Sequence, residues 1–192
     1  LTREVMPMTL HERRGRLAGR AVAALALGLS LGATPGCGWL ADAEGRRRAT
    51  LEADARRGDA AAQLALGALL ARGGQHLVAT EWLRKVAERG SLEGQIRLGE
   101  SLQALRRPEE AFLWFGRAAH KGSAEAEARV AECLRKGEGV ARADAEAMRM
   151  LRRALRQGNA RAMALMGFCC LNGQGVARDD GAACKWYRAS AA

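Results

Sequence analysis

Four glycines divide most of the chain into units of nearly equal length. Gly58, Gly90, Gly122 and Gly158 lie 32, 32 and 36 residues apart. Small and large residues recur at fixed places in each unit: Gly67, Gly99, Ala131 and Gly167; Ala79, Ala111, Ala147 and Ala183; Trp82, Trp114, Met150 and Trp186. Repetition at this period is typical of stacked helical hairpins. We therefore predict an all-α, right-handed solenoid of about four antiparallel helix pairs.

Each unit is predicted to contain a helix A and a helix B. The predicted ranges are 59–72, 91–104, 123–136 and 159–172 for the A helices, and 76–89, 108–121, 143–157 and 179–191 for the B helices. A capping residue follows every boundary glycine, namely Asp59, Ser91, Ser123 and Asn159, and these types favour helix N-termini. The recurring small residues would let helices A and B approach closely, with the recurring large residues filling the layer beside them.

The last unit resembles a Sel1-like repeat, a relative of the tetratricopeptide repeat. Its matching residues are Gly167, Gly173, Gly175, Val176, Asp179, Ala183 and Trp186, and those of the third unit are Gly137, Gly139, Val140, Ala147, Arg153, Ala154 and Gly158. The first two units resemble the tetratricopeptide version. Cys170, Ala182 and Ala131 depart from the family's usual Tyr, Lys and Gly. The resemblance implies a solenoid whose A helices line a concave face that binds proteins, and it implies no catalytic residue.

The first 36 residues read as an export signal. Arg13, Arg14, Arg16 and Arg20 precede an apolar run over 21–33, which is shorter than the roughly 20 residues of a membrane-spanning helix and fits a signal peptide. The run 34–37, Thr-Pro-Gly-Cys, resembles the lipidation signal of bacterial lipoproteins. We predict lipidation at Cys37, with cleavage after Ala43 as the alternative. Both place the protein in the bacterial periplasm or at the outer membrane.

The repeats are preceded by a tether and a cap. Residues 37–57 form this segment, with a helix predicted over 42–57 that closes the N-terminal end of the array. The repeat units then span 58–89, 90–121, 122–157 and 158–192. The next boundary glycine would fall at 194, two residues past Ala192. The array either continues in a longer chain, or a partner or a second copy covers its end.

The charge of the chain favours a solvated surface. The formal net charge is +10, with 31 Lys and Arg against 21 Asp and Glu. The excess is mostly arginine, spread along helices between acidic residues, which favours a mixed-charge surface over an anion-binding stripe. We expect no nucleic-acid partner.

Four cysteines remain besides Cys37. An exported protein meets oxidising conditions, so we consider a disulfide between Cys170 and Cys184, or between Cys133 and Cys169. The alternative is that all four are small core residues. No Cys-x-x-Cys pair with a neighbouring His is present, so we expect no zinc site.

Catalytic constellations are not recognisable. After the signal, the histidines are His76 and His120, each near a predicted helix end without a nucleophile at a useful spacing. We therefore predict a non-enzymatic adaptor without cofactors that binds other envelope proteins, or alternatively a protein that binds cell-wall glycan or another envelope polymer. The partner-binding residues predicted from the repeat register are Arg72, Glu93, Glu100, Glu132, Arg135, Lys136, Phe168 and Asn172.

Overall fold

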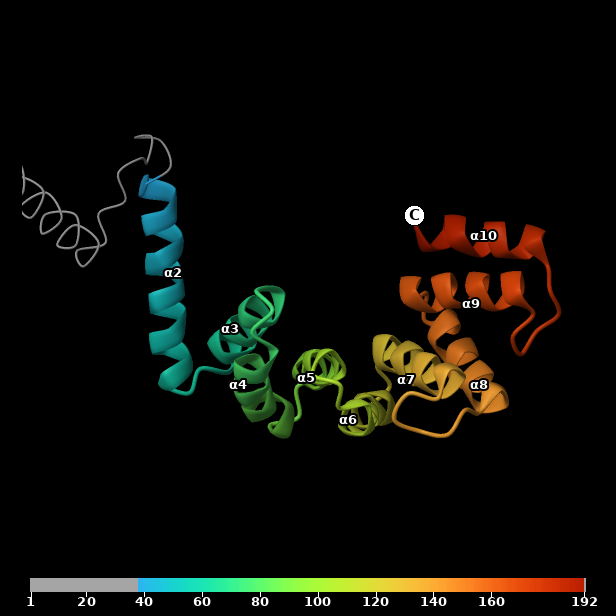
Figure 1. Ribbon diagram of the computed structural model, residues 1–192, viewed down its shortest axis with the longest axis horizontal. Helices are drawn as coiled ribbons and strands as arrows, with labels where there is room; N and C mark the ends of the chain where they lie inside the picture. Colours follow the sequence, from blue (N-terminus) through green and yellow to red (C-terminus); the bar gives the residue numbers. More distant parts are fainter. Residues whose placement is uncertain (1–37, 192) are drawn as a thin grey trace, which may run out of the picture. The chain divides into compact units, whose positions relative to one another are not determined.

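The computed structural model of the protein describes residues 38–191. This part of the chain contains only helices and their connections, which confirms the all-α prediction (Figure 1). The helices are α2 (Gly38–Arg56), α3 (Ala60–Arg72), α4 (His76–Glu88), α5 (Leu92–Ala104), α6 (Pro108–His120), α7 (Ala124–Lys136), α8 (Asp144–Arg156), α9 (Ala160–Asn172) and α10 (Asp180–Ser190). Below, α3, α5, α7 and α9 are called the A helices, and α4, α6, α8 and α10 the B helices.

The chain divides into two units between Arg47 and Arg48. All four helix pairs belong to the second unit, in which each A helix packs on the B helix that follows it and each B helix packs on the next A helix. This is a repeat solenoid of four helix pairs with an N-terminal helix. Neighbouring A helices also contact one another, since α5 reaches α3 and α9 reaches α7.

The boundaries of the eight repeat helices, α3 to α10, agree with the predicted ones to within one residue at each end. The four predicted caps are formed, because the side chains of Asp59, Ser91, Ser123 and Asn159 accept hydrogen bonds from backbone amides in the first turn of the A helices. The boundary glycines have φ between 72° and 95°, the left-handed conformation in which glycine avoids the cost of a Cβ.

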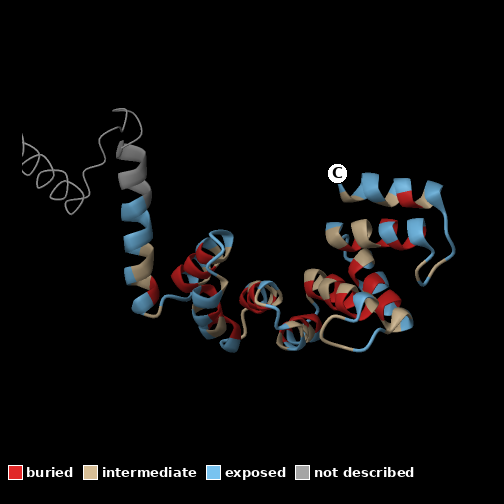
Figure 2. Cartoon of the chain, viewed as in Figure 1, coloured by how far each residue is buried: buried red, intermediate tan, exposed pale blue. Residues whose placement is uncertain are grey.

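Buried residues occur in every helix pair (Figure 2), and most of the core residues are alanine or leucine. The four recurring alanines of the B helices, at 79, 111, 147 and 183, are each no more than 5% exposed. Their small size allows the neighbouring helix to approach closely.

The residue directly opposite the small position of a repeat is the one that follows the recurring large residue. A Cβ added at Gly67 would lie 2.6 Å from Cγ of Leu83, and one at Gly99 would lie 2.7 Å from Cζ of Phe115. The side chain that fills the space opposite the small residue is therefore the one after the tryptophan. Trp82 packs against the edge of the core and is only partly buried. The next residue along the helix is rotated by about 100°, so it points toward the small residue instead.

The two double-glycine loops fix each later repeat on the one before it. Gly139 and Gly175 have φ of 73° and 70°. A Cβ at Gly139 would overlap the carbonyl of Pro108 and lie 2.7 Å from the backbone nitrogen of Glu109, at the start of α6. A Cβ at Gly175 would meet Met148 of α8. The second glycine of each loop thus permits the loop to lie against the preceding B helix.

The N-terminal helix α2 begins at Gly38, before the predicted start at 42. Ala55 near its end is 1% exposed, and its carbonyl accepts a hydrogen bond from Nε2 of Gln63 at 2.9 Å, so this end of α2 covers the first A helix. The predicted signal over 1–36 and the lipidation residue Cys37 lie outside the described residues. Among residues 38–191, no helix is long and apolar enough to cross a membrane.

Candidate interaction surface on the A helices

Repeated hydrogen bonds hold the A helices in register. Gln63 and Gln95, both buried, donate from Nε2 to the carbonyls of Ala55 and Ala87, each eight residues earlier. Arg89 and Lys121, at the ends of successive B-helix segments, donate to the carbonyls of the boundary glycines 31 residues earlier. Because the same hydrogen bonds recur in the first two repeats, these repeats pack with the same geometry. Equivalent side chains of successive A helices can therefore be compared directly.

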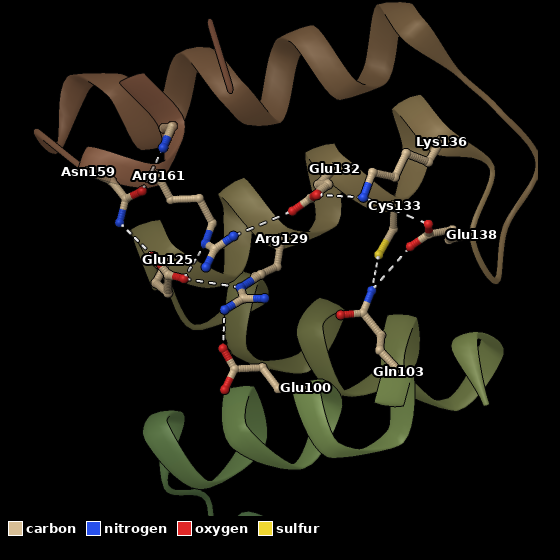
Figure 3. A network of polar contacts seen from close by, with 11 residues as sticks. Glu100, Gln103, Glu125, Arg129, Glu132, Cys133, Lys136, Glu138, Asn159 and Arg161 are labelled. Carbon is tan, nitrogen blue, oxygen red and sulfur yellow. Dashed lines mark hydrogen bonds and ion pairs between the residues drawn. The ribbon is translucent and has the colours of Figure 1, made fainter. Parts of the chain in front are cut away.

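Arg129 of α7 is the centre of a polar network that joins three A helices (Figure 3). Its side chain is only 14% exposed. The guanidinium pairs with Glu100 of α5 through Nη2 and with Glu125 of its own helix through Nε, the latter at 3.1 Å. Arg129 therefore ties α5 to α7 while remaining at the surface edge of the core.

Glu125 connects the network to α9. Its Oε1 lies 2.7 Å from Nε of Arg161, and its Oε2 accepts from Nδ2 of Asn159 at 3.1 Å. Burial opposes ionisation of Glu125, but the hydrogen bonds from Asn159, Arg161 and Arg129 outweigh it, so the pKa of this carboxyl lies below its usual value. Asn159 caps α9 with its oxygen and bridges to α7 with its nitrogen.

The network continues along α7 to the double-glycine loop. Glu132 pairs with Arg161 at 3.6 Å and with Nζ of Lys136 at 2.7 Å. Burial raises the pKa of Glu132, yet Lys136 and Arg161 lower it more, so the net shift is downward. Lys136 also lies 3.8 Å from Glu138 in the loop.

Gln103 of α5 reaches the same end of α7. Its Nε2 lies 3.6 Å from Sγ of Cys133 and 3.5 Å from Oε2 of Glu138. Burial, together with the nearby carboxylates Glu138 and Glu132, raises the pKa of Cys133 to about 11. A thiol with this pKa is protonated and unreactive near neutral pH.

Arg135 and Phe168 form a further contact between α7 and α9. The guanidinium carbon lies 4.5 Å from the centre of the Phe168 ring, and Nη1 donates to Gln174 at 2.9 Å. Phe168 is 36% exposed, and Leu171 on the same helix is 42% exposed. An arginine positioned over a partly exposed aromatic ring is a contact element typical of binding surfaces.

The predicted partner-binding residues divide into two groups in the structure. The first group, which contacts other repeats or loops as described above, contains Glu100, Glu132, Arg135, Lys136 and Phe168. Glu93 pairs only with Arg97 of its own helix, at 2.8 Å, Asn172 donates to the carbonyl of Phe168, and Arg72 makes no ion pair or hydrogen bond with any described residue. Whether these eight residues bind a partner stays a prediction.

The sequence reasoning missed the residues at the centre of the network, Arg129, Glu125 and Arg161. A signal was present, because Glu93 and Arg97 repeat the Glu125–Arg129 spacing one unit earlier. A pair at this spacing on an isolated helix reads as an ordinary surface ion pair. Only the packing of α7 between α5 and α9 turns it into a link between repeats.

Glu127 is an acidic side chain buried inside the third repeat. It is 0% exposed and stands where the first two repeats have Gln63 and Gln95. A carboxylate cannot donate to a carbonyl as those glutamines do. Instead, Oε1 lies 2.7 Å from Nη2 of Arg153 and Oε2 accepts from Nε2 of Gln157 at 3.1 Å, both from α8 and its end. The third repeat is therefore held by a charged pair where the first two repeats use an amide.

Cys133, Cys169, Cys170 and Cys184 are free thiols in the structure, the first three buried and Cys184 exposed. The pairing of Cys170 with Cys184 stays a prediction. Within residues 38–191, no group of three or more His, Cys, Asp or Glu side chains is arranged to hold a metal ion.

Comparison with known proteins identifies the repeats. A family model described as Sel1 repeat matches residues 60–91, 92–123, 124–159 and 160–192. Each match begins two residues after a boundary glycine. No curated protein matches the chain.

Solved structures agree with the family match. The crystal structure of a protective antigen from uropathogenic Escherichia coli, which displays an SLR fold, is 30% identical with a TM-score of 0.61, covering 75% of this chain and 32% of that one. A Sel1 repeat protein from Oxalobacter formigenes is 26% identical with a TM-score of 0.60, covering 75% of this chain and 63% of that one. The chain thus spans about a third of the length of the first relative and slightly under two thirds of the length of the second. The structure of MamA, 20% identical with a TM-score of 0.53, shares the fold. With four matched units that fill its helical array, the chain belongs to the Sel1 repeat family.

Proposed function

We propose that this Sel1-repeat solenoid, a protein-interaction scaffold of a typically non-catalytic kind, acts as an adaptor in the bacterial cell envelope. In this proposal the A helices α5, α7 and α9 bind a segment of another envelope protein. The observation that carries the proposal is the stack of Arg135 on the exposed ring of Phe168, beside a network of ion pairs on the same helices.

Preorganisation supports the assignment of this surface. The side chains of Arg129, Arg161 and Lys136 are already held by carboxylates of neighbouring turns or repeats. Fixing long side chains costs free energy when a complex forms, so side chains ordered beforehand reduce that cost. Arginine and aromatic residues are also the types that most often contribute strongly to protein interfaces.

Affinity capture from solubilised envelope tests the adaptor proposal. The bait is the full chain with a C-terminal tag, compared with an Arg135→Glu/Phe168→Ala variant. The matched control is Arg117→Glu/Leu113→Ala, which reverses one charge and truncates one apolar side chain at exposed positions of the B helix α6. We expect the wild type and the control to retain a discrete protein that the A-helix variant loses. Recovery of cell-wall material alone would favour polymer binding, and equal loss from both variants would contradict the assignment of the A-helix face.

Export and lipid attachment form a separate part of the proposal. The support is the arginine-rich start, the apolar run over 21–33 and the cysteine at position 37. Cells grown with labelled palmitate should incorporate label into the envelope-bound protein, and Cys37→Ser should abolish the incorporation. A mature N-terminus at Glu44 without label would instead support cleavage after Ala43.

A further inference from the structure

A pocket of about 210 Å³ opens between the first two A helices. Its walls include Ala68, Ala71 and Arg72 from α3, His76 at the start of α4, and Arg97 and Ser101 from α5. Between α7, α8 and α9 lies a space of only about 10 Å³, whose lining includes Arg135, Leu165 and Cys169, the equivalents of Ala71, Arg97 and Ser101. The side chains at these three positions therefore border an open pocket in the first repeats and a nearly filled space in the last two.

The second interval shows what closes the space. Between α5 and α7, Glu100 pairs with Arg129, and Gln103 contacts Cys133. One repeat earlier, 32 residues back, Ala68 replaces Glu100 and Ala71 replaces Gln103, whereas Arg97 corresponds to Arg129 and Ser101 to Cys133. The cation and the polar side chain of α5 are kept, but the two side chains that would contact them from α3 are absent.

Arg97 is consequently left with half of the contacts that Arg129 makes. Arg129 pairs with Glu125 four residues earlier and with Glu100 of the preceding A helix. Arg97 pairs with Glu93 four residues earlier, with Nη2 2.8 Å from Oε1. On its other side, however, the residue at the position of Glu100 is Ala68, which has no carboxylate. The side of the guanidinium toward α3 is free to bind an external carboxylate.

Two buried polar atoms at the pocket wall also lack partners in the described part of the chain. Ser101 is 1% exposed and its Oγ makes no hydrogen bond, and Nδ1 of His76 is likewise buried without one. Buried polar atoms of this kind are rare in folded proteins because leaving them unpaired costs free energy. A ligand that enters the pocket and offers hydrogen-bonding atoms would satisfy them.

The charges around the pocket favour an anion. Arg72 lines it without an ion-pair partner among residues 38–191, and Arg97 adds a second cation. Glu100 also lines the pocket, but its carboxylate pairs with Arg129. The N-terminus of α4, which His76 begins, receives no side-chain cap from Gln75, and an uncapped helix N-terminus adds positive potential.

We infer that this pocket binds the carboxylate of an acidic side chain from a bound protein segment, with Arg97 contacting it as Arg129 contacts Glu100. Arg72 supplies the second cation, and Ser101 donates a hydrogen bond from its hydroxyl. The inference rests on the proposed function and extends the binding surface from α5 to α3, since it states which chemistry the partner brings there. Arginine suits this role because its planar fork matches a carboxylate.

The probe for the test is N-acetylglutamate N-methylamide, titrated into the full chain and followed by amide NMR shifts. Saturable shifts are expected at Ala71 and Ser101. The glutamine analogue, which has the same shape without the charge, should bind at least about tenfold more weakly. Equal binding of both compounds, or stronger binding of inorganic phosphate than of the carboxylate, would overturn the inference.

Two substitutions make the test specific to the pocket. Ala68→Glu recreates the Glu100–Arg129 pair one repeat earlier, so it should abolish probe binding while the chain melts at the same or a higher temperature. Ala145→Glu, at an exposed position of α8, adds the same charge elsewhere and should leave binding unchanged. Arg97→Gln should weaken binding about tenfold, and Arg117→Gln should not. If the pocket variant and its control lost the same probe affinity, in either pair, the effect would be one of general charge and the site would be refuted.

These results separate the pocket from the proposed function. A variant chain that loses the probe but still captures its protein partner would leave the adaptor proposal standing and refute the claim that the partner enters this pocket.

Discussion

Gly99 of α5 lies directly against the ring of Phe115 of α6. A Cβ at this position would come within 2.7 Å of Cζ, and Phe115 is 0% exposed. The contact brings helices A and B of the second repeat together, and its equivalent joins Gly67 to Leu83 in the first. In the fourth repeat the ring opposite Gly167 belongs to Tyr187, which is 40% exposed. The same glycine position is therefore under different steric pressure in different repeats.

Alanine at these glycines should separate the two cases. Gly99→Ala should lower the free energy of unfolding by about 1–3 kcal/mol, because the buried ring cannot move aside. Gly167→Ala should be close to neutral, because Tyr187 can shift toward solvent while alanine gains up to about 1 kcal/mol in helix propensity. Urea denaturation of both variants is the measurement. Equal costs at the two positions would contradict the packing described for the second repeat.

Alanine at the loop glycines should also give unequal costs. Gly139→Ala combines a left-handed backbone, which costs about 1–2 kcal/mol, with overlap on the backbone of Pro108 and Glu109, for a total of about 2–4 kcal/mol. Gly175→Ala has the same backbone cost but meets the flexible side chain of Met148. In thermal melts, Gly139→Ala should have a clearly lower melting temperature than Gly175→Ala.

Replacing the buried Glu127 by glutamine should destabilise the protein less than removing the charge of its partner Arg153. Glu127→Gln restores the residue type of the first two repeats, so we expect less than about 1 kcal/mol of destabilisation. Arg153→Met leaves a carboxylate that is 0% exposed without its cation, at a cost of about 2 kcal/mol, since the arginine is half exposed and part of the interaction is screened.

A double-mutant cycle checks the coupling of these two residues. In the Glu127→Gln background, Arg153→Met should cost much less, because no buried charge remains. Costs that simply add would show that Arg153 does not stabilise the buried carboxylate.

Acid should weaken the contacts between the A helices. The pKa values of Glu125 and Glu132 are lowered in the folded protein, relative to an unfolded value near 4.3. Stability from these groups is therefore complete above that value and is lost as the pH falls through the lower folded pKa values. The urea midpoint should drop between about pH 5 and pH 3. Glu125→Gln should flatten this dependence, and Glu81→Gln, at an exposed position of α4, should leave it unchanged. A slope unaffected by Glu125→Gln would refute the role of this carboxylate.

The helices and their caps could be predicted from the sequence because their signals are local. Boundary glycines followed by Asp, Ser or Asn mark each A helix, and the ends of all eight repeat helices, α3 to α10, lie within one residue of the prediction. The residue opposite the small position could not be chosen in the same way. Each B helix carries two large neighbours there, such as Trp114 and Phe115, and only the rotation of the packed helix decides which one points inward.

The surface was harder to predict than the fold for a related reason. Arg129 and Arg97 occupy equivalent positions and have the same acidic neighbour four residues earlier, so the sequence of their own helices does not distinguish them. What differs is the residue on the preceding A helix, Glu100 against Ala68. That difference has a meaning only once the neighbouring A helices are known to be in contact.

Photo-crosslinking in living cells tests the central claim most directly. A photoreactive residue would replace Asn172 at the exposed end of the A helix α9, and, as a control, Arg152 at an exposed position of the B helix α8. The account predicts a discrete crosslinked protein from position 172 and none from position 152. A crosslink from position 152 alone, or the same products from both positions, would contradict binding on the A-helix face.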